Sequence, residues 1–172
     1  DQLCSLDKDK GFLFLSRPTG IELSPDQVRI LDAAYSIVKG FQQQDKTQFL
    51  NAAATLIGTG GGLTPSGDDF LTGFLLYHVR RELASGEPSS FLADWCKELT
   101  TLAFNKTTTI SANRLLFAAR GWSEDIFLHL IDHLFDPAVT FTCDEIRLLM
   151  EIGHSSGVDT FMGIYYAIIA IN

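Results

Sequence analysis

Two stretches of the chain share one spacing of small and acidic residues. The repeated residues are Ser66, Gly67, Asp69 and Gly73, then Ser156, Gly157, Asp159 and Gly163. Each copy opens an apolar segment that is typical of a buried helix. A helix N-terminus carries unpaired N–H groups and a partial positive charge, so it favours the binding of anions. Two helix starts of one design therefore predict a shared anion site.

A glycine-rich loop precedes the first of these predicted helices, with glycine at positions 58 and 60–62. Because glycine has no Cβ, such a backbone can approach a ligand closely. The loop has neither the Gly-Lys-Ser/Thr of a Walker loop nor a GxGxxG pattern. Hydroxyls near 107–111 either cap another helix or line the same pocket. The candidate substrate-binding residues are Gly61, Gly62, Thr64, Ser66, Gly67, Thr108, Ser111, Ser155, Ser156 and Gly157.

The repeated serines and aspartates also fit a simpler interpretation, in which each pair forms a capping box at a helix start. The chain offers further boxes of that kind at Ser24–Gln27 and Thr142–Glu145. Those two lack the glycines at +1 and +7, and a glycine inside a helix costs about 1 kcal/mol relative to alanine. The extra glycines therefore predict close packing, with two buried helices crossing near Gly73 and Gly163.

Carboxylates that meet at such a crossing repel each other unless they share a cation or a proton. In one chemistry, Mg²⁺ bridges the aspartates, with Asp69 and Asp159 as its ligands, and carries an anionic substrate. In the other, which we favour, the helix starts bind the anion and an aspartate orients or deprotonates a nucleophile. Arg114 pairs either with an anion or with a surface carboxylate. The candidate catalytic residues are Asp68, Asp69, Asp159 and His154.

Apolar periodicity predicts a mainly α fold, a single-domain bundle of about eight helices. Residues 11–15 are the one candidate β element. The expected helices cover about residues 25–44, 46–58, 65–84, 89–104, 108–120, 123–135, 143–152 and 157–171. We expect residues 1–20 to be an N-terminal segment separate from a helical domain at 21–172.

Composition excludes several classes of function. Thirteen basic against 21 acidic residues give a net charge of −8, and no basic tract is present, so we expect no nucleic-acid partner. No apolar run is long enough to span a bilayer, so we expect no membrane association. The three cysteines are widely spaced and cannot all pair, which favours reduced thiols and a cytoplasmic protein.

Residues Gly62–Gly73 and Gly153–Gly163 resemble the signature segments of one bacterial family. Its members were long described as carboxylases of unknown function, and one is a subunit of the oxamate carbamoyltransferase of allantoin degradation. The resemblance covers about residues 46–169. Members carry additional N-terminal sequence, so residues 1–20 are interpreted as the remnant of a further domain or the start of a short member. The middle segment of the family is matched by Thr107, Thr108, Ser111, Leu115, Ala118, Ala119 and Gly121.

The resemblance implies a subunit of a multisubunit carbamoyltransferase in purine catabolism, with other subunits as partners. Its ligand would be a small anion, carbamoyl phosphate or oxamate, bound at the paired helix N-termini. The cofactor requirement is open, with Mg²⁺ as the candidate. Two alternatives stand beside this hypothesis: a Mg²⁺-dependent hydrolase of the all-α aspartate-cluster type, and a non-catalytic subunit in which the motif only locks two helices together.

Overall fold

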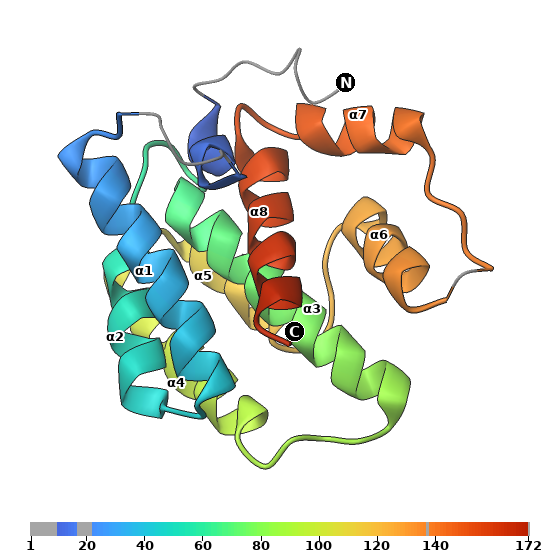
Figure 1. Ribbon diagram of the computed structural model, residues 1–172, viewed down its shortest axis with the longest axis horizontal. Coiled ribbons are helices and arrows are strands. Elements are labelled where there is room, and N and C mark those ends of the chain that lie inside the picture. The colour runs from blue at the N-terminus through green and yellow to red at the C-terminus, as the bar shows by residue number, and fades with distance from the viewer. Residues whose placement is uncertain (1–9, 17–21, 137, 172) are drawn as a thin grey trace.

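The computed structural model describes residues 10–16, 22–136 and 138–171, and this part of the chain is mainly helical, as predicted (Figure 1). Eight α-helices and one 3-10 helix occupy it, without a strand among the described residues. Their bounds are η2 Gly11–Ser16, α1 Pro25–Gln42, α2 Lys46–Leu56, α3 Ser66–Ser85, α4 Leu92–Lys106, α5 Thr109–Ala118, α6 Asp125–Phe135, α7 Cys143–Glu151 and α8 Ser156–Ile169.

The β element expected at residues 11–15 is wrong, because this segment is the 3-10 helix η2. Gly11 turns the chain with φ of +51°, and the Phe12 N–H donates to the side chain of Asp159 rather than to a neighbouring strand. Phe12, Phe14 and Leu15 are buried, and η2 packs on α8. Residues 1–9 and 17–20, the rest of the expected N-terminal segment, lie outside the described residues.

Local sequence signals account for several helix ends. Ser24 and Gln27 form a full capping box at α1, where Pro25 takes the first helical position, and Thr142 and Glu145 form another at α7. Gly86 ends α3 in the left-handed conformation that glycine adopts without steric cost. These elements were all placed to within a few residues by their periodicity and caps.

Helices α3 and α8 form the centre of the molecule and share the largest interface between any two elements (Figure 1). They cross at the predicted glycines. A Cβ placed on Gly73 would lie 2.0 Å from the carbonyl oxygen of Thr160, and one on Gly163 would lie 1.9 Å from that of Phe70. Such distances leave no room for a side chain, so the crossing requires glycine on both helices.

An aromatic cluster joins α3 to α1 and α4 at the end away from the repeated motifs. His78 stacks on Phe41 with ring centroids 3.8 Å apart, and Trp95 packs against Phe41 and Phe49. Burial lowers the pKa of His78 to about 3, so this ring is neutral and structural at neutral pH. Trp122 differs from the buried Trp95, since 62% of its surface is exposed.

None of the helices in the described ranges is long and apolar enough to cross a membrane.

Candidate functional site

The repeated sequence motif corresponds to a repeated helix–loop–helix unit, α2–α3 and α7–α8. In each unit the motif's first glycine packs against the end of the preceding helix. A Cβ on Gly67 would lie 1.9 Å from the Leu56 carbonyl oxygen, and one on Gly157 would lie 1.8 Å from that of Leu149. The first glycine of each motif, Gly67 or Gly157, therefore lets two consecutive helices pack closely at their junction. The second, Gly73 or Gly163, allows α3 and α8 to cross.

The two connecting loops begin alike and differ in length. Ile57 and Ile152 end their helices with nearly the same extended backbone, and Gly58 and Gly153 follow with positive φ. The first loop, residues 57–65, has nine residues, whereas the second, residues 152–155, has four. The glycine run therefore lies in the longer loop, and the second helix–loop–helix unit has no counterpart to it.

The two helices begin side by side, and their hydroxyls meet. We call Thr64, Ser66, Ser155 and Ser156 the hydroxyl layer. Thr64 Oγ1 lies 2.9 Å from Ser156 Oγ, and Ser66 Oγ lies 3.5 Å from Ser155 Oγ. Ser66 and Ser156 are the first residues inside their helices, and the residues before them make no side-chain cap. The capping-box interpretation of the motif is therefore wrong, and the serines link the two helix starts.

Asp69 lies beneath this layer and is 1% exposed. One carboxylate oxygen accepts a hydrogen bond from Arg114, and the other has no partner among the described residues. Burial raises the pKa of Asp69 to about 7; the Arg114 guanidinium and the neighbouring Ser156 hydroxyl act to lower this pKa, and the Asp159 carboxylate nearby acts to raise it. Near neutral pH this group therefore carries a proton part of the time.

Asp159 is the matching residue of the second unit and is fully buried. Its Oδ1 accepts from the Phe12 N–H at 2.6 Å, and its Oδ2 is unpartnered within the described structure. Burial raises the pKa of Asp159, while the hydrogen bond from Phe12 and the neighbouring Ser66 and Ser155 hydroxyls act to lower it. Ser156 of α8 thus lowers the pKa of the aspartate of α3, and Ser66 of α3 lowers that of the aspartate of α8.

Asp68 has a different environment from the paired aspartates. One oxygen accepts from the Gly58 N–H at 2.9 Å, and the other accepts a short hydrogen bond from the Thr107 hydroxyl. Burial raises its pKa, and these donors together with Ser111 act to lower it. Asp68 therefore ties the glycine loop to the start of α5, with both oxygens engaged.

The remaining predicted residues divide between the loop and its supports. Thr108 donates to the Leu63 carbonyl at 2.6 Å and Ser111 to the same oxygen at 3.4 Å, so both hold the loop. Gly61 and Gly62 are exposed, with open space where a Cβ would stand. His154 is exposed in the turn before α8.

Gly67 and Gly157 already use their N–H groups within the protein. Gly67 donates to the Thr59 carbonyl at 2.9 Å and Gly157 to that of Ile152 at 3.0 Å. Across the described ranges, no group of three or more His, Cys, Asp or Glu side chains is placed to hold a metal ion. A cation at this site would depend on Asp69 and Asp159 alone among acidic side chains.

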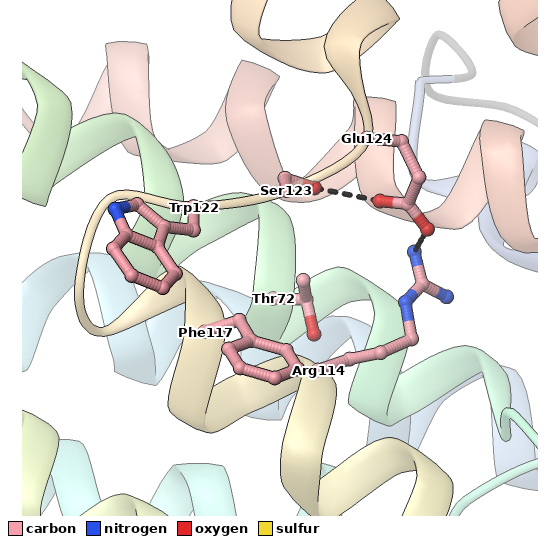
Figure 2. A pocket seen from close by; sticks show the side chains of 6 residues that line it. All are labelled: Thr72, Arg114, Phe117, Trp122, Ser123 and Glu124. Carbon is pink, nitrogen blue, oxygen red and sulfur yellow. Dashed lines mark hydrogen bonds and ion pairs between the residues drawn. The ribbon is translucent and has the colours of Figure 1, made fainter.

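Arg114, which binds Asp69, also lines a cavity of about 510 Å³ (Figure 2). Arg114 was predicted to pair with an anion or a surface carboxylate; it contacts the buried Asp69 and also Glu124, at 2.9 Å. Periodicity in the sequence places Arg114 on a helix but carries no signal for a partner 45 positions away. The cavity is lined by Thr72, Arg114, Phe117, Trp122, Ser123 and Glu124.

Comparison with known proteins agrees with the resemblance seen in the sequence. No solved structure matches this fold. The family described as oxamate carbamoyltransferase subunit AllH matches residues 56–168, which include both helix starts, the hydroxyl layer and the paired aspartates. Since this match covers well over half of the 172 residues, the chain belongs to the oxamate carbamoyltransferase subunit AllH family.

Proposed function

We propose that this carbamoyltransferase subunit binds a small oxyanion, carbamoyl phosphate or oxamate, at the hydroxyl layer over the N-termini of α3 and α8. The observation that carries the proposal is the contact between Thr64 and Ser156, which places donors from both units at one point above two helix starts. The family match supports the transferase, because its residues 56–168 include this whole region.

Binding would exchange one set of hydrogen bonds for another. The Thr64–Ser156 contact is made between two hydroxyls, and an oxyanion inserted between them would accept from both. Bonds to a charged acceptor are stronger than those between neutral groups. The partial positive charge of two helix N-termini adds to the attraction, and the same donors would stabilise the negative charge that develops during carbamoyl transfer.

The carboxylates beneath the layer suit the rest of such a substrate. Asp69 and Asp159 each have one oxygen without a partner among the described residues. Carbamoyl phosphate and oxamate both end in an NH₂ group. This group would donate to the free carboxylate oxygens once the ligand separates the Thr64 and Ser156 hydroxyls. A partly protonated Asp69 could also exchange a proton with the substrate, and exposed His154 is the second candidate for acid–base chemistry.

Thermal unfolding with added ligand tests the proposal, since a ligand that binds only the folded protein raises its melting temperature. We expect carbamoyl phosphate, oxamate or inorganic phosphate to stabilise the wild type. The variants Thr64→Val and Ser156→Ala should each weaken this binding about tenfold, the equivalent of 1.4 kcal/mol. Thr101→Val, whose hydroxyl bonds only within α4, should leave it unchanged.

The same experiment separates the alternatives. Stabilisation by Mg²⁺ alone that is lost in Asp159→Asn would favour the hydrolase. An unchanged melting temperature with every anion, together with full activity of a complex reconstituted with Ser156→Ala, would favour the non-catalytic assembly subunit. Either result would contradict an anion site at the hydroxyl layer.

A further inference from the structure

An exposed apolar surface surrounds Trp122, which lies on the loop between α5 and α6 (Figure 2). Trp122 and Leu83 are each 62% exposed, and Phe117 is 44% exposed. The rings of Phe117 and Trp122 lie nearly parallel, with an angle of 20° and centroids 6.5 Å apart. Gly121 joins this pair to α3, because a Cβ on it would lie 2.7 Å from the Leu83 side chain. We call Val79, Leu83, Pro88, Phe117 and Trp122 the Trp122 surface.

Two cavities open at this surface. One is the cavity of about 510 Å³, which has Phe117 and Trp122 in its wall. The other has a volume of about 300 Å³ and is lined by Val79, Glu82, Leu83, Gly86 and Pro88. Protein interfaces commonly combine such hollows with an exposed aromatic anchor, and tryptophan is among the residues that contribute most to binding. The Trp122 surface therefore has the form of a protein contact.

The polar side chains of the larger cavity are already engaged within the chain. The Thr72 hydroxyl donates to a backbone carbonyl at 2.8 Å, and the Ser123 hydroxyl donates to Glu124 at 2.7 Å. Arg114 is paired with both Asp69 and Glu124. Since these groups satisfy one another, binding in the cavity would come from the burial of apolar surface. The cavity therefore suits an apolar side chain better than a charged metabolite.

Family membership indicates what covers this surface. The chain belongs to a family of enzyme subunits, and a subunit needs a face that contacts its neighbours. Contiguous exposed apolar patches mark such faces. Arg120, which directly precedes Gly121 and Trp122, is exposed and forms no ion pair within the described residues. An acidic side chain on the neighbouring subunit would complement it.

A second copy of this chain is a less suitable occupant. In a symmetric dimer the same patch faces itself, so Arg120 would meet a surface that carries another Arg120 instead of an acidic residue. Each copy also has a net charge of −8, and like charges oppose association. A different subunit avoids both costs.

We infer that the Trp122 surface is the contact of this chain with another subunit of the same transferase. That subunit covers Trp122, places an apolar side chain in the larger cavity and sets an acidic residue opposite Arg120. The inference rests on the family membership and not on the proposed anion site, which uses the hydroxyl layer on α3 and α8.

Reconstitution with the purified remaining subunits of the transferase tests the inference, with affinities measured by surface plasmon resonance. Trp122→Ala should weaken the association about thirtyfold, the effect expected for a central interface tryptophan. Phe104→Ala, which removes an exposed ring from α4, is the matched control and should bind as wild type. Arg120→Glu should weaken the association about tenfold, and Lys97→Glu, the same kind of change on α4, should have no effect.

Hydrogen exchange on the wild type locates the contact without any variant. In the complex, the amides of residues 83–87 and 119–124 should exchange more slowly than in the free chain. Protection confined to other elements, unchanged affinity of Trp122→Ala, or failure of the chain to bind the other subunits would each overturn the inference. A dimer of this chain alone that Trp122→Ala dissociates would also overturn it. Trp122→Ala should keep any stabilisation by phosphate, so the anion site is judged separately by thermal unfolding.

Discussion

Gly73 and Gly163 mark one crossing from its two sides, since each brings its backbone against a carbonyl oxygen of the opposite helix. This contact brings the starts of α3 and α8 together and so sets the positions of the hydroxyl layer and the paired aspartates. The close approach has an energetic consequence, because any side chain at either position would push the helices apart.

We therefore expect Gly73→Ala and Gly163→Ala each to lower the free energy of unfolding by about 3 kcal/mol, at the upper end of the usual cost of overpacking. Urea unfolding followed by circular dichroism measures this change. Gly61→Ala is the matched control, because Gly61 has open space where its Cβ would stand. If all three variants were equally stable, the helices could not cross at these glycines.

The raised pKa of Asp69 predicts a dependence of stability on pH. The Asp69 carboxyl has a pKa of about 7 in the folded protein and an ordinary value of 3.8, which we take for the unfolded chain. It therefore binds its proton more tightly in the folded protein. The proton therefore stabilises the fold fully below about pH 4, and this contribution is lost as the pH rises through 7. The loss is on the order of 4 kcal/mol.

Comparison of Asp69→Asn with wild type isolates this effect, since most other groups titrate alike in both proteins. The variant resembles the protonated form, so we expect its stability relative to wild type to improve as the pH rises from about 4 to about 7, and to level off above that. Chemical unfolding across that range measures the difference. Asp125→Asn, an exposed change, should show none of this trend. A pH-independent difference for Asp69→Asn would mean that Asp69 ionises normally.

Asp68 should act as a structural anchor through its bond with Thr107. A double-mutant cycle with Asp68→Asn and Thr107→Val should therefore be non-additive, the double variant losing about 1 to 2 kcal/mol less than the sum of the singles. Urea unfolding of the four proteins gives this coupling energy. A parallel cycle of Asp68→Asn with Thr101→Val should be additive, because Thr101 bonds within α4. Additivity in both cycles would show that Asp68 is not held by Thr107.

The crossing of α3 and α8 could be predicted from sequence because glycine inside an apolar helix is unfavourable without a packing reason. A second local signal is the spacing of four residues between Asp69 and Gly73 and between Asp159 and Gly163, which places each pair on one helix face. The role of the serines, in contrast, depends on residues about 90 positions away in the sequence. Ser66 and Ser156 fit a capping box by spacing, but their hydroxyls contact the partner helix, and only the packing of the two units decides between these outcomes.

The cavity and the 3-10 helix escaped prediction for the same physical reason. Arg114 takes its partners from α3 and from the start of α6, and no periodicity in the chain records that choice. Residues 11–15 are apolar enough for a strand, but the Phe12 N–H bonds to Asp159, 147 positions away. Short apolar runs carry too little local information to separate these conformations.

The contact between η2 and Asp159 leads to the last prediction, which concerns Gly11. Its φ of +51° is strained for any residue with a side chain, and a Cβ there would lie 2.2 Å from Asp159 Oδ1. Gly11→Ala should therefore separate η2 from α8, lower the free energy of unfolding by about 2 kcal/mol and leave the Asp159 carboxylate without its donor.

Hydrogen exchange measures this detachment residue by residue. In wild type the Phe12 amide is buried against Asp159, so its exchange should be slow, and Gly11→Ala should accelerate it strongly. Exchange in α2 should change little, because that helix packs on α1 and α4. Ser16→Ala, which removes only a hydroxyl bond to the Leu13 carbonyl, is the control within η2. Slow exchange of Phe12 in Gly11→Ala would show that the Asp159 contact tolerates a side chain at position 11.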